Sequence, residues 1–221
     1  MSSHTEKPIY GFGEEVANSI THGIGILLAI VGLIVMIHFA ALYGDSWHLV
    51  SCSIFGATLI FAYTTSTLYH SIPIPGPKRI LRMLDHAAIF LLIAGTYTPF
   101  TLISLRGPWG WSLFGTIWGL AICGVICKVF MPEKLSKVST LLYIAMGWVV
   151  VVAAQPLLTS VASEGLLLLL AGGLAYTGGV VFYAWERMPY NHMVWHLFVM
   201  AGSTLHFFAI LFYVIPIPAG I

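Results

Sequence analysis

The sequence predicts an all-α fold, a polytopic membrane protein built as a seven-transmembrane-helix bundle. Three observations indicate this class. First, 59% of the 221 residues are hydrophobic and only 8% are charged, whereas a soluble globular domain carries roughly 25% charged residues. Second, the mean hydropathy is +0.94. Third, seven separate runs are long enough to cross a bilayer, which takes about 20 apolar residues in a helix.

The first three runs are separated by short breaks that contain turn residues or charges. We place the first span at about 20–42, where YGDSWH ends it. The second, at about 49–71, ends at SIPIPGPKR, whose prolines and glycine interrupt a helix. The third, at about 84–105, ends at RGPWG. Because each break is short, we expect these spans to belong to one bundle.

The last four runs follow the same pattern, with MPEKLSK, TSVASEG and ERMPYN between them. No break is long enough for a further domain. We therefore divide the chain into a short cytoplasmic N-terminal segment, 1–15, and a transmembrane domain, 16–216. The remaining spans of that domain are predicted at about 109–130, 138–158, 165–185 and 193–215.

The distribution of lysine and arginine predicts the orientation. Cytoplasmic loops of membrane proteins carry an excess of these residues. Only Arg106 falls on one side of the predicted spans, so we expect the N-terminus in the cytoplasm and the C-terminus outside. A net charge of +1 gives no basic surface for nucleic acid. The residues on the predicted cytoplasmic side are Lys7, Lys78, Arg79, Arg82, Lys128, Lys134, Lys137 and Arg187.

Polar and ionisable residues from four segments gather at this same side. Such residues are costly inside a bilayer and usually mark function. Each of them stands at the cytoplasmic end of its predicted span, and scattered accidental polar residues would not be expected to do this. They are Glu15, Asn18, His22, His70, Asp85, His192 and His196.

The spacing of the histidines favours a metal site. His192 and His196 are i,i+4, which places both imidazoles on one helix face, where a single helix can offer them to one metal. Ser66 and His70 have the same spacing. Three histidines from two helices are a ligand set typical of catalytic zinc, with a fourth position open to water. Asp85 is then placed to act on that water as a base, and Ser66 to hold the water or polarise a carbonyl.

Each residue also has a structural interpretation. A histidine within a span is often a hydrogen-bonded residue of the bundle and no ligand. Asp85 alternatively pairs with Arg82 or caps the third span. Glu15 and Asn18 are alternatively interfacial residues at the start of the first span. The sequence leaves these alternatives open.

We do not assign His206 or the two cysteines of the fourth span as metal ligands. His206 is ten residues past His196, about 15 Å deeper along a helix, so it cannot share an ion with the pair. We interpret it as a buried, hydrogen-bonded histidine or one that lines a cavity. Cys123 and Cys127 are also i,i+4, and we interpret them as small residues packed in the core.

Four motifs carry a resemblance to a known family. They are EEVANSITHG, STLYHS, LDHAAIFLLIAGTYTPF and HMVWHLFVMAGSTLHF. With them the chain resembles the progestin and adipoQ receptor family, specifically its bacterial hemolysin III-like branch, over about residues 12–213. The resemblance implies a seven-helix bundle with a cytoplasmic N-terminus. It also implies Zn²⁺ held by His70, His192 and His196, with Asp85 on the zinc-bound water and Ser66 beside it.

The resemblance also bears on activity. The family's site is similar to that of alkaline ceramidases, in which a zinc-bound water attacks a lipid amide. Bacterial members are named for early lytic activity and have been linked to membrane-lipid homeostasis. The resemblance therefore implies a protein of the bacterial inner membrane that acts on a membrane lipid, for example an N-acyl lipid.

Three functions therefore compete. The first is an intramembrane zinc hydrolase of a lipid amide or ester. The second is a non-enzymatic sensor or regulator of lipid state in which zinc is structural. The third is a lytic, pore-forming protein, against which the spans offer few charges and no ring of like charges. A buried, lipid-sized cavity beside the metal favours the first, and a closed, dry site favours the second. The sequence indicates neither the substrate nor the oligomeric state.

Overall fold

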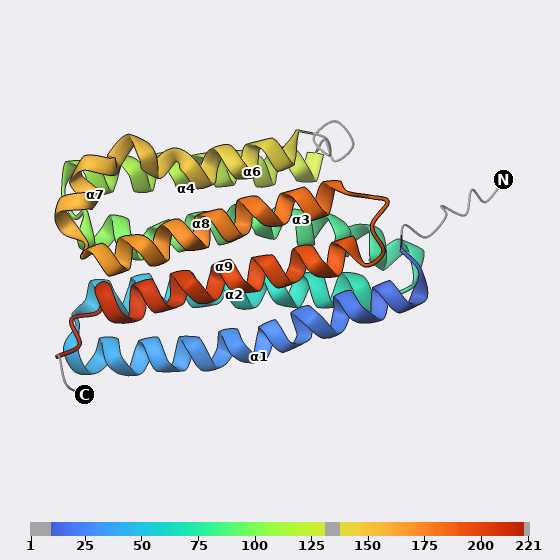
Figure 1. Ribbon diagram of the computed structural model, residues 1–221, viewed down its shortest axis with the longest axis horizontal. Coiled ribbons are helices and arrows are strands. Elements are labelled where there is room, and N and C mark those ends of the chain that lie inside the picture. The colour runs from blue at the N-terminus through green and yellow to red at the C-terminus, as the bar shows by residue number, and fades with distance from the viewer. Residues whose placement is uncertain (1–9, 131–137, 219–221) are drawn as a thin grey trace.

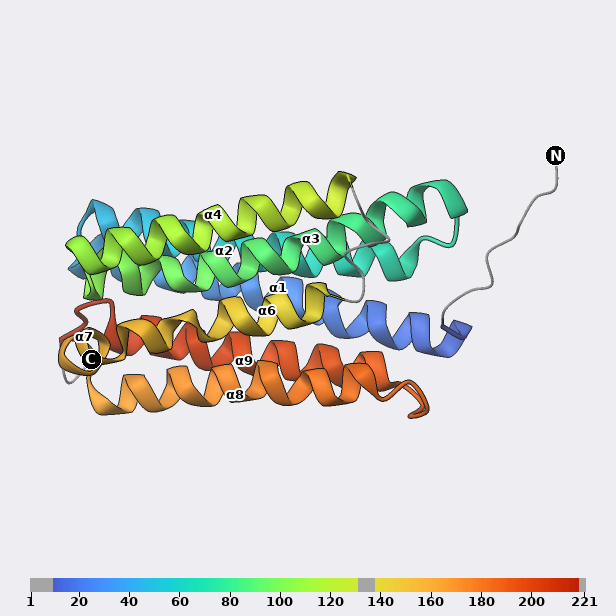
Figure 2. The same ribbon diagram turned by 90° about the horizontal axis from the view of Figure 1, so that it is seen from above.

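The computed structural model describes residues 10–130 and 138–218. Within these ranges all regular structure is helical, which confirms the predicted all-α class. Seven helical segments of the described chain are long and apolar enough to cross a membrane. They lie side by side along the long axis of one bundle (Figures 1 and 2).

Five of the spans are single uninterrupted helices and two are compound. The single ones are α1 (Phe12–Tyr43), α2 (Ser46–Ser71), α4 (Pro108–Phe130), α8 (Ser163–Ala184) and α9 (Asn191–Tyr213). The third span is α3 (Pro75–Pro99) followed by a π-helical turn, η1 (Phe100–Ser104). The fifth span consists of α6 (Ser139–Trp148), a 3₁₀ turn, η2 (Val149–Ala153), and α7 (Ala154–Ser160).

Local chemistry explains several helix ends. The Asp45 side chain accepts hydrogen bonds from the backbone N–H groups of Trp47 and His48, at 2.9 and 3.1 Å, and so caps α2. Pro75 stands in the first turn of α3, where its missing N–H costs nothing. Pro99 lies at the end of α3, and the wider π-helical turn follows it, because proline cannot continue the regular hydrogen-bond ladder.

A side chain of α3 forms hydrogen bonds with the backbone groups left unpaired at the break in the fifth span. The Tyr97 hydroxyl accepts a hydrogen bond from the backbone N–H of Val150 at 2.9 Å and donates to the carbonyl of Gly147 at 2.7 Å. Backbone groups freed by a helix break must find partners inside a bilayer. Tyr97 supplies them at the 3₁₀ turn.

The third span is the centre of the bundle and the outer helices face lipid. Of its most apolar stretch 72% is buried, against 17% for each of the fifth and sixth spans. α9 packs along α8 and against α1. Large apolar side chains are exposed along the outer helices, as contact with acyl chains requires. On α1 and α8 they include Leu27, Val31, Ile34, Leu167, Leu170 and Leu174.

Two helices begin well before the predicted spans. α1 begins at Phe12 and α3 at Pro75. The predicted spans included only the apolar residues, whereas each helix also extends through the polar membrane interface. The interpretation of the cysteine pair is wrong: Cys123 is exposed on α4 and Cys127 is only half-buried. Cysteine is apolar enough to face lipid, so its presence in a span does not place it in a core.

Candidate metal centre

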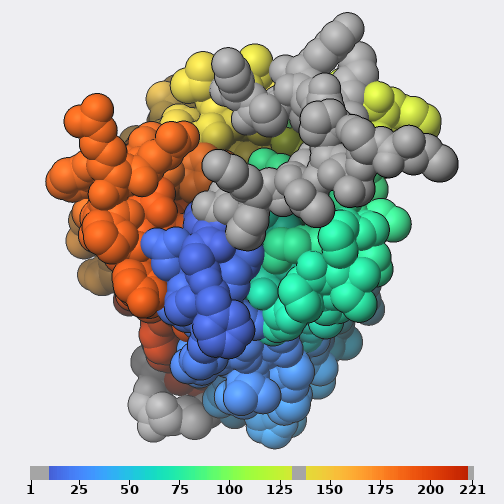
Figure 3. Space-filling view, turned by 90° about the vertical axis from the view of Figure 1, so that its right-hand side faces the viewer, coloured from blue at the N-terminus to red at the C-terminus, as the bar shows by residue number. Residues whose placement is uncertain are grey.

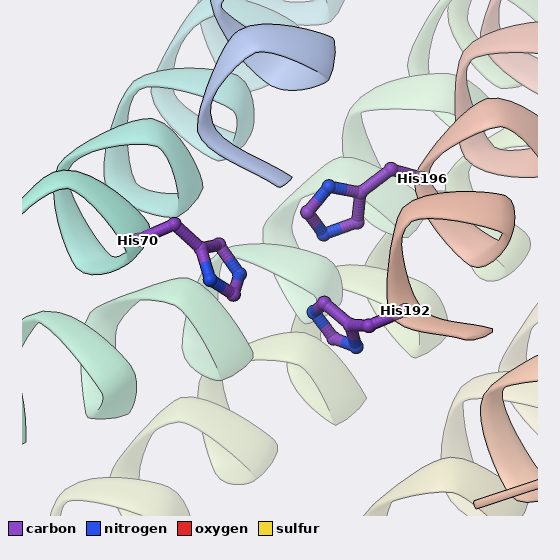
Figure 4. Close-up of side chains that lie close together, drawn as sticks. All are labelled: His70, His192 and His196. Carbon is purple, nitrogen blue, oxygen red and sulfur yellow. The ribbon is translucent and has the colours of Figure 1, made fainter. Parts of the chain in front are cut away.

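Three histidines meet at one end of the bundle. His70 lies in the last turn of α2, and His192 and His196 lie in the first two turns of α9. All three are buried, and one ring nitrogen from each lies within 4.8 Å of the others. Figure 4 shows the three imidazoles turned toward one another from the two helices. The structure thus brings together the residues that the sequence proposed as metal ligands.

Local geometry fixes this triad. The i,i+4 spacing holds the rings of His192 and His196 with centroids 4.5 Å apart, and the His70 ring lies 5.1 and 5.3 Å from them. α9 begins directly after Tyr190, whose backbone is left-handed with φ 57°. That uncommon conformation is held from α1, because the Tyr190 N–H donates to Glu14 Oε1 at 2.8 Å.

The hydrogen bonds indicate which nitrogens are free. His70 Nδ1 lies 2.6 Å from Glu15 Oε2, so it donates there and leaves Nε2 without a partner in the described ranges. His196 Nδ1 donates to the backbone carbonyl of Asn18 at 3.3 Å. Both nitrogens of His192 lack a partner among described residues.

This pattern fits a metal ion. A histidine that binds a metal usually donates its other N–H to a carboxylate or a backbone carbonyl, as His70 and His196 do here. A buried polar atom left without a partner costs about 1–3 kcal/mol. The unpartnered nitrogens of His70 and His192 are therefore what an ion between the three rings would satisfy.

Helix α1 surrounds the triad with polar side chains. Glu15 bonds His70 on one side and pairs with Lys78 Nζ at 2.9 Å on the other. Asn18 is fully buried, and its Nδ2 lies 3.4 Å from His70 Nδ1. The His22 ring stacks on His196 at a centroid distance of 3.5 Å. The structure therefore decides the open question of Glu15 and Asn18: both contact the triad.

Asp85 and Ser66 lie at the same end. Asp85 lines a cavity that His192 and His196 also line, and its nearest ion-pair partner in the described chain is His86 Nδ1, at 3.8 Å. The buried Ser66 hydroxyl lies next to the Asp85 carboxyl. Asp85 does not cap α3, because that helix begins at Pro75. No ion pair with Arg82 is found in the described ranges.

The cavity runs away from the triad into the bundle. Its volume is about 150 Å³, room for about ten water-sized groups. α3, α6, α8 and α9 supply most of its lining, which is largely apolar and aromatic. Asp85 and His192 lie at one end, and Tyr97 and His206 at the other. Figure 3 looks onto the end of the bundle where α1 begins and where the α2–α3 and α8–α9 connections gather, which is the end that holds the triad.

One aromatic residue of the site carries no signal in the sequence. The Tyr10 ring lies 4.9 Å from that of His192 and 5.8 Å from that of His70. Burial, with the nearby Tyr183, raises the pKa of Tyr10, so its phenol stays protonated beside the triad. A tyrosine just before a helix matches no spacing rule for ligands, and only the folded chain brings it here.

Fold and site define a class: an integral membrane protein of seven helices with a buried histidine triad that can hold a metal ion. Comparisons with known proteins agree. The family model described as haemolysin-III related matches residues 10–207, and the chain belongs to this family.

The relatives span bacteria and mammals. The chain is 50% identical to Hemolysin-3 of Bacillus cereus, over 92% of this chain and 93% of that protein. It is 46% identical to the Hemolysin-3 homolog of Bacillus subtilis (strain 168), over 93% and 96%. It is 31% identical to the monocyte to macrophage differentiation factor of Homo sapiens, over 89% and 83%. The similarity to both kinds of relative confirms the resemblance drawn from the four motifs.

Proposed function

We propose that this protein is a zinc-dependent hydrolase that cleaves an amide or ester bond of a membrane lipid. One observation carries the proposal: a three-histidine site lies beside a carboxylate at the end of a buried, largely apolar cavity. A structural zinc is more usually closed by four protein ligands. Here Asp85 lies beside the triad and outside the set of mutually close ligands, which leaves a coordination position for a reactant.

Zinc is the ion that the ligands favour. Neutral imidazole suits Zn²⁺, and a site of three histidines without thiolate is typical of catalytic zinc. When bound, zinc supplies Lewis acidity that polarises a carbonyl and acidifies a water molecule. His70, His192 and His196 would hold the ion. Glu15 and the Asn18 carbonyl orient two of these imidazoles.

The chain's own groups then complete the reaction. The acyl chain lies in the cavity, with the scissile carbonyl near Asp85. Water adds its oxygen to the carbonyl carbon, and the carbon–nitrogen or carbon–oxygen bond breaks. Asp85 takes one water proton and returns it to the leaving nitrogen or oxygen, as a positioned carboxylate can. The other proton stays with the fatty acid. Ser66 steadies the water or the carbonyl oxygen.

The charges support a site in the cytoplasmic half of a bacterial plasma membrane. Lys78, Arg82 and Arg187 lie at the triad end, in the first turns of α3 and in the connection before α9. Arg106 lies in the α3–α4 connection at the opposite end, over the Trp47 ring. By the positive-inside rule the N-terminus is then cytoplasmic and the C-terminus external.

The direct test is an assay of purified, zinc-loaded protein against long-chain N-acyl and ester lipids in mixed micelles. We expect slow release of fatty acid that stops on chelation and returns with zinc. If no lipid of either class releases fatty acid, the hydrolase proposal fails, and a regulator with a structural ion takes its place. The largely apolar lining of the cavity gives no support to an aqueous pore.

A further inference from the structure

Five tyrosines of the described chain line the cavity, and one of them has a hydroxyl group that the fold does not use. Four of the hydroxyls form hydrogen bonds within the bundle, those of Tyr63, Tyr97, Tyr143 and Tyr176. The fifth tyrosine is Tyr183, in the last turn of α8, and its hydroxyl has no hydrogen bond within the described ranges. No tyrosine oxygen in those ranges is both enclosed by protein and unpartnered, so the Tyr183 hydroxyl is accessible to a ligand.

The surroundings of this hydroxyl show that it points into the bundle. It interacts electrostatically with the Asp85 carboxyl of α3 and with the phenols of Tyr10, before α1, and Tyr143, on α6. Groups from three other segments can reach one oxygen of α8 only if that oxygen lies on the inner face of the helix. Because Asp85 and Tyr143 line the same cavity, the hydroxyl opens on the triad end of it.

Helix α9 holds the Tyr183 ring beside the triad. The ring centroid lies 5.8 Å from that of His192 and 5.8 Å from that of Trp195, one helical turn further along. The Asn191 side chain donates to the backbone carbonyl of Tyr183 at 3.2 Å, which ties the last turn of α8 to the first turn of α9. The hydroxyl is therefore preorganised relative to the site, as a catalytic hydrogen-bond donor has to be.

The proposed hydrolysis needs such a donor. When water adds to the substrate carbonyl, the electron pair of the C=O π bond moves onto the carbonyl oxygen, and donors aimed at that oxygen lower the barrier. Asp85 only accepts as a carboxylate. A tyrosine hydroxyl has an ordinary pKa of about 10, so at neutral pH it is protonated and can donate. Tyr183 is the phenol lining the triad end whose O–H is free for this purpose.

We propose that Tyr183 is a catalytic residue that donates a hydrogen bond to the scissile carbonyl oxygen as this oxygen becomes an oxyanion. The inference rests on the proposed function for the identity of the reacting group. The phenol keeps its proton throughout, so the proton transfers by Asp85 are unchanged. When the carbon–nitrogen or carbon–oxygen bond breaks, the electron pair on the oxygen forms the C=O bond of the fatty acid again.

The test compares two ligands that differ in the geometry of one centre. Monomethyl hexadecylphosphonate is tetrahedral and anionic, as the oxyanion is, whereas methyl heptadecanoate is planar and neutral at the same position. Each competes with a fluorescent fatty acid for zinc-loaded protein in one detergent. We expect Tyr183→Phe to bind the phosphonate about 10- to 100-fold more weakly, as the loss of a hydrogen bond to a charged group implies. Its affinity for the ester should not change, and kcat should fall by roughly 10²–10³.

Tyr143→Phe is the matched control. It removes the same atom from the same end of the cavity, but this hydroxyl donates to the backbone carbonyl of His86 at 2.8 Å. The control should melt at a lower temperature than wild type and keep the wild-type preference for the phosphonate. Tyr183→Phe should melt as wild type does, because its hydroxyl has no hydrogen bond in the described part of the chain.

Each other outcome overturns the assignment. An equal loss of phosphonate affinity in both variants would indicate a general effect on the cavity, and no phosphonate binding by wild type would refute the donor. A lower melting temperature of Tyr183→Phe would give its hydroxyl a structural role. Full hydrolysis and full phosphonate affinity in Tyr183→Phe would leave the proposed function and remove this inference. Selective loss of phosphonate affinity in a protein that hydrolyses no lipid would keep the donor and remove the hydrolase.

Discussion

Glu15 Oε2 lies 2.6 Å from Nδ1 of His70, although 55 residues separate the two in the chain. This contact joins the first turn of α1 to the last turn of α2 at the candidate metal centre. Because it occupies Nδ1, it fixes the tautomer of His70 and leaves Nε2 for an ion. Lys78 holds the other carboxylate oxygen, so the carboxylate is itself kept in place.

Removing this carboxylate should weaken zinc binding while the three ligands remain. For Glu15→Gln we expect zinc affinity to fall about 10- to 100-fold, the usual effect of losing such an orienting partner. Competition with a chromogenic chelator measures it. Glu164→Gln, an exposed acid at the start of α8, is the control and should change nothing. Equal affinity in both variants would show that Glu15 has no influence on the site.

The ligands themselves should determine metal content. Wild-type protein should hold one zinc, and His192→Ala or His196→Ala should lose it by elemental analysis. Chelation should also lower the melting temperature, because an ion that binds only the native state stabilises it. His38→Ala, an exposed histidine of α1, should keep its zinc. Full zinc content in both ligand variants would end the assignment.

The carboxylate of Asp85 should matter for turnover and little for binding. Asp85→Asn keeps the shape of the side chain but removes the base. We expect zinc content and thermal stability to remain, while hydrolysis falls by roughly 10²–10⁴. Undiminished hydrolysis by this variant would exclude Asp85 as the proton carrier. Complementation of a deletion strain by the variant would mean that the cellular role needs no such chemistry.

The orientation can be read with reporters. A reporter fused after Ile221 should be external, and one inserted near Gly76, in the first turn of α3, should be cytoplasmic. A periplasmically active enzyme and a cytoplasmically fluorescent protein give opposite signals at each position. The reverse pattern at both would refute the orientation drawn from lysine and arginine.

Tyr97 should support the broken fifth span. Tyr97→Phe leaves the Val150 N–H and the Gly147 carbonyl without the hydroxyl that bonds them. We expect the free energy of unfolding to fall by about 1–3 kcal/mol, the cost of unpaired buried groups. A thermal or denaturant melt in detergent measures it. Tyr43→Phe, at the end of α1, is the control. An equal loss of stability in both variants would mean that the hydrogen bonds of Tyr97 to the break contribute nothing specific.

The sequence predicts the spans and the triad well, because both depend on short-range patterns. Seven apolar runs specify seven helices, and i,i+4 spacing with a shared side brings His192 and His196 to His70. Other features depend on distant contacts. Whether Glu15 lies at the membrane interface or contacts the triad depends on where α1 packs. The hydrogen bond of His206 Nε2 is made to the backbone carbonyl of Leu169, on another helix. No local pattern encodes either contact.

The arrangement of the triad has a consequence for biogenesis. His70 belongs to the second helix to emerge from the ribosome, and His192 and His196 belong to the last. A nascent chain that lacks α9 therefore offers only one imidazole of the triad and lacks the i,i+4 pair. If the triad binds an ion, as proposed, the ion can bind only after the final helix is inserted, so a metal-loaded site would mark a bundle whose first and last helices have come together.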